Sequence, residues 1–448
     1  MGRSACVRGL GLAALLALLP SPLLAADDDR KVAQDDRIAE LERKVEVLTD
    51  ELERTRSDMA VPESELESNW GLGPAASKVY GLTRGLSIGG YAEGFYTAVV
   101  KDKHESGEEN RFDMLRAVLY TGYKFTDNIV WNSEIEFEHA TTEAEFFQEG
   151  GSVSVEFAAL DFLWKDPLNA RVGLLLLPMG FLNEVHEPPY YLGTHRPETE
   201  RRIIPTTWRE NGVGIFGQLL GEKLSYRLYT INGFNAVGYN SGGIRDGRQN
   251  GSEALANDMA VVGRVDYAPL PWLDLGGSFY VGNSGQSQSF DGVKIPDALT
   301  TVWEMHAQVR THGLQVRGLV AMDHVNQAGR LTRALGPDGT GDLDAGEAIA
   351  RDMIGVYGEV SYEVLQWILP EHGGSMELEP FVRVEWVDTQ NDMPSGFQAD
   401  RSQELQIVTT GLQFYPIPQV VLKLDYRNKH AEQGAAGDEV NAGFGLVF

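Results

Sequence analysis

The chain is poor in three things that would place it in common protein classes. It has a single cysteine, Cys6, among 448 residues, and apart from a weak candidate at its very start it has no uncharged apolar run that could span a bilayer as a helix. The missing runs exclude an α-helical membrane protein. Positive charge is also scarce, because 38 Lys and Arg face 65 Asp and Glu. A net charge of −27 excludes a general affinity for nucleic acid or for an anionic membrane surface.

Catalytic and metal-binding motifs are missing as well. The sequence has no Gly-x-Ser-x-Gly, no HExxH spacing and no candidate nucleophilic cysteine, and a pair such as His306 with Glu304 could resemble part of a catalytic site by chance. The segment 338–347 resembles a calcium loop, but Leu343 and Ile349 stand where that loop needs Gly and Glu. We therefore predict no enzyme, no cofactor and no metal.

The first residues have the pattern of a secretory signal peptide. Arg3 and Arg8 precede an apolar core over 10–19, and the small residues Ala25 and Ala26 come before an acidic break. We predict a signal peptide over 1–26. Cys6 leaves with it, so disulfides are not expected to hold the mature chain together.

A short heptad pattern follows the signal. Its apolar positions recur at spacings of 3, 4, 3 and 4 and are Ile38, Leu41, Val45, Leu48 and Leu52. This predicts a coiled-coil oligomerisation helix over 30–60, in the periplasm, or alternatively one amphipathic helix lying on the rest of the protein. Residues 61–85, rich in Ser, Gly, Pro and Ala, are expected to be a linker.

From residue 86 to residue 448, segments of about ten residues alternate apolar and polar side chains. In 420–429, for example, Leu422 and Leu424 oppose Lys423, Asp425 and Arg427. We count sixteen such segments, joined by eight long and seven short connections that alternate along the chain. Tight turns at one end and longer loops at the other are typical of bacterial outer-membrane barrels.

A soluble sandwich or propeller would also have many short strands. It would not ordinarily place charge on one face of nearly every strand and aromatic residues at the ends of the other face. We therefore predict an all-β fold: a 16-stranded antiparallel transmembrane β-barrel over 86–448, preceded by the short coiled-coil helix. It would be a multi-pass protein of the bacterial outer membrane.

One long connection, 179–209, differs from the others because it follows a strongly apolar strand and is aromatic and proline-bearing. We expect it to fold into the lumen. Its start, Pro178-Met179-Gly180-Phe181, its Arg196-Pro197, and its return through Trp208-Arg209-Glu210-Asn211-Gly212 resemble the phosphate-selective porin O and P family, including relatives that carry an N-terminal coiled coil.

The resemblance implies a homotrimer of sixteen-stranded barrels that passes small anions along a ladder of basic residues. The loop candidates are Arg196, Arg201, Arg202 and Arg209, and the wall candidates are Arg116, Arg171, Arg227, Arg264, Arg383 and Arg427, together with Arg310, Arg317, Lys423 and Lys429. Arginine binds oxyanions through several charge-assisted hydrogen bonds. Many glutamates share the predicted inner face, however, so a transverse field is expected and phosphate specificity is not supported.

The sequence favours a porin, a water-filled channel in the lipid bilayer for passive diffusion of small hydrophilic solutes, with a substrate-specific anion porin as a narrower alternative. A second alternative is a structural or adhesive barrel with a plugged lumen and partner-binding outer loops. The last residue, Phe448, ends the last strand, and the resemblance to outer-membrane porins implies that it acts in membrane assembly.

Overall fold

The computed structural model describes residues 37, 39–41, 43–49, 51, 68–143, 150–290, 292–336, 347–369 and 376–448. The chain divides into two compact units, Met1–Val61 and Pro62–Phe448. In the first unit the described residues are helical, and Leu41, Val45 and Leu48 of the heptad pattern are exposed. The signal peptide, Ile38 and Leu52 lie outside the described residues. Among the helices that are described, none combines the length and apolarity needed to cross a membrane.

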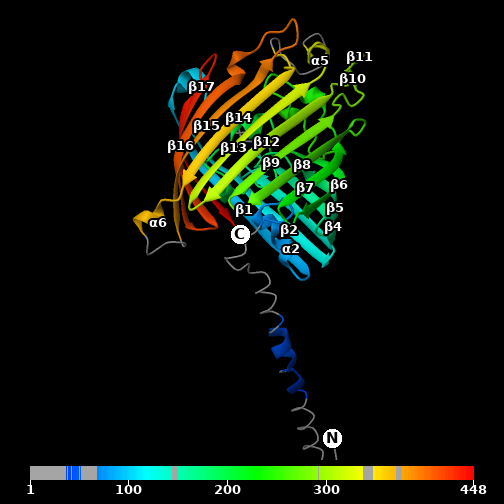
Figure 1. The fold of residues 1–448 in the computed structure, drawn as a ribbon, viewed down its shortest axis with the longest axis vertical. Helices are drawn as coiled ribbons and strands as arrows, with labels where there is room; N and C mark the ends of the chain where they lie inside the picture. The colour runs from blue at the N-terminus through cyan, green and yellow to red at the C-terminus, as the bar shows by residue number, and fades with distance from the viewer. Residues whose placement is uncertain are drawn as a thin grey trace, which may run out of the picture. The chain divides into compact units, whose positions relative to one another are not determined.

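The second unit contains a closed barrel of sixteen strands in which all neighbours pair antiparallel (Figure 1). This confirms the barrel and the strand number expected from the sequence. The strands are β1 (Gly85–Lys101), β2 (Arg111–Thr126), β3 (Ile129–Glu138), β4 (Val153–Lys165), β5 (Leu168–Leu176), β6 (Arg209–Leu219), β7 (Leu224–Asn232), β8 (Met259–Leu270), β9 (Leu273–Gly282), β12 (Thr300–Thr311), β13 (Leu314–Val325), β14 (Asp352–Tyr362), β15 (Glu377–Asp392), β16 (Glu404–Ile417), β17 (Val420–Ala431) and β18 (Asp438–Val447).

Short helices and one hairpin occupy the connections. The helices are α2 (Pro74–Gly81), α3 (Lys103–Ser106), α4 (Glu198–Arg202), α5 (Ala328–Leu335) and α6 (Leu365–Ile368); the 3-10 turns are η1 (Pro188–Tyr190), η2 (Ala236–Gly238), η3 (Arg245–Gly247) and η5 (Arg401–Gln403); the hairpin is β10 (Ser289–Phe290) with β11 (Val293–Lys294). The two-residue turns that join neighbouring barrel strands, such as 127–128 and 418–419, lie at one end of the barrel, which we call the short-turn end.

The alternation read from the sequence becomes two faces of the barrel wall. In β17, Leu422 and Leu424 are exposed on the outside, whereas Lys423, Asp425 and Arg427 are buried on the inside. Exposed aromatic side chains recur near strand ends, among them Tyr123, Trp164, Tyr267, Trp272 and Trp303. An apolar belt with aromatic edges suits a surface that faces lipid.

The barrel closes where β18 meets β1. The amide of Phe448 donates to the carbonyl of Gly90 at 2.9 Å, and the amide of Gly90 donates back to Phe448 at 3.0 Å. The aromatic ring stays on the outer surface with half of its area exposed, and a Cβ on Gly90 would lie only 2.8 Å from it. The last residue therefore takes part in the seam of the barrel.

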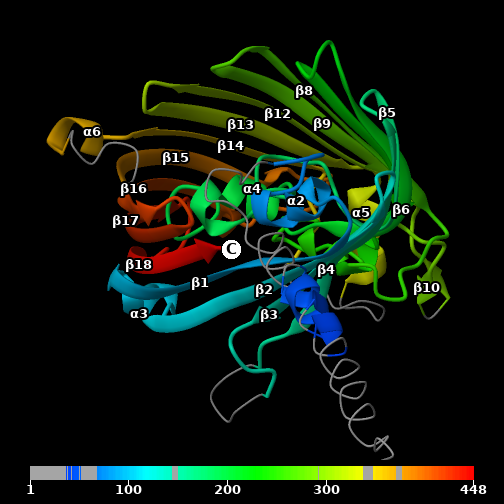
Figure 2. The same cartoon turned by 90° about the horizontal axis from the view of Figure 1, so that it is seen from below.

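The segments that lie inside the ring of strands include two that contact its wall (Figure 2). The first is the connection between β5 and β6, residues 177–208, which we call the inner loop; it carries η1 and α4. The second is residues 68–84, which belong to the predicted linker. Here the structure differs from a simple linker, because these residues form α2 and pack against β1, β2 and β3. Ala75, Ala76 and Val79 give this stretch an apolar face that its composition did not reveal.

Candidate functional site

Hydrogen bonds join the two ends of the inner loop, which we call its neck. The side-chain amide of Asn183 donates to the carbonyls of Leu177 (2.7 Å) and Trp208 (2.9 Å), and its oxygen accepts from the amide of Trp208 at 2.6 Å. Gly180 has a φ of +65°, and a Cβ there would lie 2.7 Å from a carboxylate oxygen of Glu200. Glycine is the residue that adopts this backbone conformation without strain. The motif residues at the two ends of the loop thus meet in one structure.

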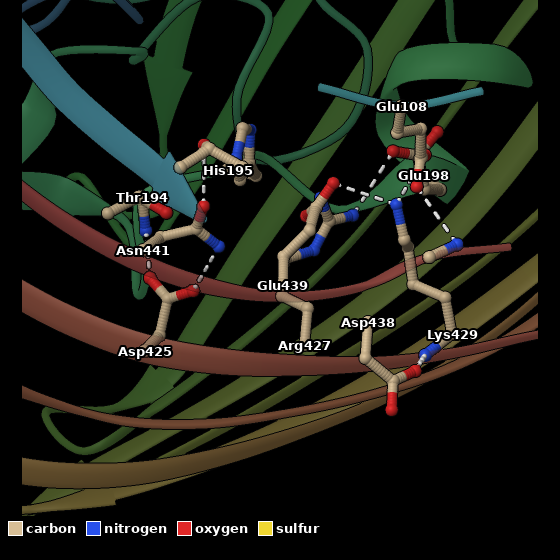
Figure 3. Close-up of polar contacts among 12 residues, drawn as sticks. Glu108, Thr194, His195, Glu198, Asp425, Arg427, Lys429, Asp438, Glu439 and Asn441 are labelled. Atoms are coloured by element: carbon tan, nitrogen blue, oxygen red, sulfur yellow. Dashed lines mark hydrogen bonds and ion pairs between the residues drawn. The ribbon is translucent and has the colours of Figure 1, made fainter. Parts of the chain in front are cut away.

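Beyond the neck, the loop lies against the inner wall formed by β14 to β18. Thr194 donates its amide to Asp425 at 2.7 Å, and Asn441 donates to the other oxygen of Asp425 at 2.9 Å (Figure 3). Wall cations bind loop carbonyls in return: Lys423 donates to Tyr191 and Gly193, at 3.0 and 2.8 Å, and Arg383 donates to Leu192 and His195, at 3.0 and 2.9 Å. These contacts fix the path of the loop through the lumen.

Glu198, at the start of α4, is the electrostatic centre of this contact. Its carboxylate pairs with Arg201 at 2.7 Å, Arg202 at 3.1 Å and Arg427 of the wall at 3.3 Å. Burial by itself would raise the pKa of Glu198, but the three guanidinium groups hold this pKa well below its usual range. Arg427 continues to Glu439 at 3.0 Å, so the loop and β18 share one ion-pair network (Figure 3).

Most of the predicted wall cations, and Arg209 directly after the inner loop, lie on the inner face and are paired with carboxylates. The pairs are Arg116 with Glu93 and Glu136 (2.9 Å each), Arg171 with Asp161 (2.7 Å), Arg227 with Glu184 (3.2 Å) and Asp266 (2.5 Å), Arg264 with Asp266 (2.8 Å), Arg383 with Glu385 (2.8 Å), Arg209 with Glu156 (2.7 Å), Lys429 with Glu439 (2.7 Å), and Arg317 with Glu359. Arg310, near a short turn, has a longer contact with Asp274 at 3.8 Å. Paired charges of this kind hold the wall and the loop together.

Two of the predicted loop arginines have a buried nitrogen without a hydrogen-bond partner: Nη2 of Arg196 and Nε of Arg209. Arg209 is paired with Glu156, whereas Arg196 has longer-range partners only among the described residues. Arg196 interacts electrostatically with Glu134 and with His186. Arg196 thus retains unsatisfied hydrogen-bonding capacity inside the barrel.

Two further arginines, Arg245 and Arg248, come from the connection between β7 and β8. They bind carbonyls on the return limb of the inner loop: Arg245 donates to Arg201 at 2.9 Å and to Thr206, and Arg248 donates to Pro205 at 2.9 Å and Thr207 at 3.1 Å. Carbonyl partners satisfy hydrogen bonds without neutralising the charge. The sequence prediction considered only the inward positions of strands and the segment 179–209, so it missed Arg245 and Arg248. The sequence does show them as two arginines three residues apart in a long connection.

We call Arg196, Arg201, Arg209, Arg245 and Arg248 the arginine cluster. Burial, followed by the repulsion of Arg248, Arg201 and Arg196, lowers the pKa of Arg245 to about 9. Burial and the nearby Arg209 lower the pKa of Arg248 to about 10. Glu198, Glu156 and Asp246 offset part of this charge. Both guanidinium groups remain charged at neutral pH, so the cluster is a region of positive potential inside the barrel.

His186 gives the inner loop a predicted pH dependence. Its ring is buried, with Nε2 3.2 Å from Glu134 and Nδ1 3.2 Å from the carbonyl of Asn183, and burial lowers its pKa to about 3. An unfolded histidine titrates near pH 6.5, so stability is full above that value and falls as the pH drops toward 3. At pH 5 we expect a loss of up to about 2 kcal/mol in the free energy of unfolding.

Urea unfolding at pH 7.5 and pH 5 measures this loss. The matched variant is His186→Gln, which keeps a hydrogen-bonding side chain but cannot titrate in this range. Wild type should lose more stability than the variant between the two pH values. Equal losses would show that His186 is not the titrating group.

Among the described residues, no three His, Cys, Asp or Glu side chains are grouped so that they could hold a metal ion. Most of the segment that resembles a calcium loop, 338–346, lies outside the described residues.

The barrel has a fold similar to that of solved outer-membrane porins. The solved structure of OmpF from Salmonella typhi, in complex with daunomycin, matches with a TM-score of 0.50 and 12% identity, over 82% of this chain and 98% of that chain. An anion-selective porin from Comamonas acidovorans matches with a TM-score of 0.47 and 11% identity, over 82% of this chain and all of that chain. No protein-family model matches the sequence.

A closer relative defines the family. An uncharacterized protein of Aquifex aeolicus (strain VF5) is 36% identical over 398 residues, which are 88% of this chain and 87% of that protein. The chain therefore belongs to the same family as the Aquifex aeolicus protein.

Proposed function

We propose that the protein is an outer-membrane porin, a channel for passive diffusion of small hydrophilic solutes. The closed barrel, its apolar outer belt and its charged inner face support this function. The inner loop supports it too, because a loop tied to the inner wall narrows the passage and sets which solutes meet which charges.

The solutes that suit the lumen best are small anions. The observation that carries this choice is the arginine cluster, whose members Arg245 and Arg248 bind backbone carbonyls and keep their charge. The wall arginines argue against a site specific for phosphate, because their guanidinium groups are already paired with carboxylates. The proposal is therefore a general preference for anions. We propose phosphate or carboxylates as members of a broad class of solutes.

Planar bilayers containing the purified protein test this proposal. In a tenfold KCl gradient, the reversal potential should have the sign of chloride preference. Conductance steps in multiples of three would support the homotrimer, for which the heptad residues Leu41, Val45 and Leu48 are the proposed contacts in the periplasm. A reversal potential of the opposite sign would reject anion preference.

A second candidate has a specific observation in its favour. Residues 68–84 fill part of the lumen, as a structural or adhesive barrel with a plugged lumen would require. This alternative predicts that the protein inserts into bilayers and carries no ion current. The same bilayer experiment therefore separates the two functions.

A further inference from the structure

Residues 69–81, which we call the inner segment, are folded and lie within the lumen at the short-turn end. Trp70 packs its ring edge-on against Phe216 of β6, with 5.3 Å between centroids. A Cβ on Gly71 would lie 1.9 Å from Nη1 of Arg227 on β7. Farther along, α2 contacts β1, β2 and β3. The inner segment thus follows the inner wall from β7 round to β1, and Figure 2 shows α2 within the ring of strands.

The apolar face of α2 is seated on the wall. Ala75 and Ala76 are buried in a cluster with Leu72 and with residues of the inner face, namely Tyr91, Val118, Tyr120, Phe157, Leu176 and Val447. Val79 is buried beside Gly122 of β2. Two of the three helix side chains in this contact are single methyl groups, so the apolar area that α2 buries is small. An eight-residue helix is also too short to be stable by itself in water. Its position depends on additional polar contacts.

One polar contact joins α2 to the inner loop. Gly73, which precedes the helix, provides no side-chain cap, and Oε1 of Glu187 instead accepts from the amides of Ala75 at 3.1 Å and Ala76 at 3.4 Å. The second carboxylate oxygen of Glu187 is buried without a partner. A glutamate side chain supplied by the inner loop therefore accepts the hydrogen bonds at the start of the helix.

Four wall side chains hold the rest of α2. Asn132 donates to the carbonyl of Ala76 at 2.7 Å, and Lys124 donates to the carbonyl of Tyr80 at 3.0 Å. The hydroxyl of Tyr80 donates to Asp161 at 2.6 Å and accepts from Arg171 at 3.2 Å. Each contact is a hydrogen bond to a short helix, and water entering the mouth could replace the backbone contacts one by one.

From these contacts we propose that the inner segment is a built-in plug, which narrows the short-turn mouth of the lumen while Glu187 holds it and widens the passage when it is released. This inference rests on the proposed channel function. It reconciles the filled mouth with a conducting barrel, because a plug held by a short helix and a few hydrogen bonds can leave without unfolding any strand.

A cysteine lock tests the proposal. A Cβ at Gly122 would lie 2.8 Å from Cβ of Val79, so Val79→Cys with Gly122→Cys needs a shift of about 1 Å to reach disulfide geometry. The only natural cysteine, Cys6, lies in the predicted signal peptide. The oxidised double variant should stay at a low conductance, and a reducing agent should restore transitions to a higher level. Val79→Cys alone, which cannot form the internal bridge, is the control.

A second variant replaces residues 69–81 by a Gly-Ser sequence of equal length. We expect its conductance to be roughly twice that of wild type and without the low level, and we expect Glu187→Ala to open more often than wild type. The matched control for Glu187→Ala is Glu138→Ala. Glu138 also lies on the inner side of the barrel, on β3, but it accepts a hydrogen bond from Ser152 and does not contact the plug. A folded Gly-Ser variant with wild-type conductance would overturn the plug. If neither wild type nor the two variants, the cysteine lock and the Gly-Ser replacement, conduct ions, the channel function itself is overturned.

Discussion

Replacing Arg245 and Arg248 together by glutamate is expected to reverse the ion preference of the channel. The change moves the local charge by four units inside a passage already lined by glutamates. Two charges several ångströms apart interact by about 1 kcal/mol in water and by more beside protein, and 1.4 kcal/mol is tenfold in an equilibrium constant. The anion-to-cation permeability ratio should therefore fall by roughly tenfold or more, which the reversal potential in a salt gradient measures.

A matched control separates this local effect from a change in net charge. Arg330 and Arg333 on α5 are also three residues apart, and both are exposed. Arg330 binds Gln327, and Arg333 lies over the ring of Phe397. The double glutamate variant at these positions should leave the reversal potential close to that of wild type. An equal shift in the two double variants would remove the arginine cluster as the selectivity element.

Deleting Phe448 is expected to reduce the folded barrel several-fold. The deletion removes the two hydrogen bonds between Phe448 and Gly90, each contributing about 1 kcal/mol, and an aromatic ring from the outer belt. It also places the terminal carboxylate on Val447, whose side chain is buried inside the barrel. The fraction of heat-modifiable protein on gels measures folding, and single-channel conductance of the remaining folded protein measures the pore.

Two substitutions divide the role of Phe448 between ring and backbone. Phe448→Tyr keeps an aromatic ring and both backbone contacts, and it should assemble like wild type. Phe448→Ala keeps the backbone contacts only, and an intermediate yield would assign part of the effect to the ring. Normal assembly of the deletion variant would show that the seam tolerates a shorter last strand. We expect the deletion to harm assembly more than conductance, so a loss of conductance with normal assembly would contradict the role of Phe448 in the seam.

The barrel could be predicted because its signals are local in the sequence. A strand with one face toward apolar surroundings must alternate its side chains with period two, as 420–429 does, and alternating loop lengths follow from antiparallel neighbours. The heptad residues are a weaker case: Leu41, Val45 and Leu48 are exposed in the helical part of the first unit, and their association in threes stays a prediction.

The site was less accessible from the sequence. The alternation along each strand placed Arg116, Arg171 and Arg317 on the inner face, but their carboxylate partners come from neighbouring strands, so their pairing depends on strand register. Arg427 bonds Glu198 across 229 residues of chain. The importance of Arg245 and Arg248 depends on the path of the inner loop, whose carbonyls they bind.

The sequence by itself thus determined the class of fold and the inward and outward faces, because both follow from the order of polar and apolar side chains along each strand. It predicted the number of strands to within about two. Only the tertiary structure decided what fills the lumen. Segment 68–84 has no sustained period, and its fold is set by contacts with residues far along the chain, such as Glu187, Asn132 and Asp161. The tertiary structure also decided which arginines are paired with carboxylates and which are not. That pairing depends on distances across the barrel, which the local order of residues does not encode.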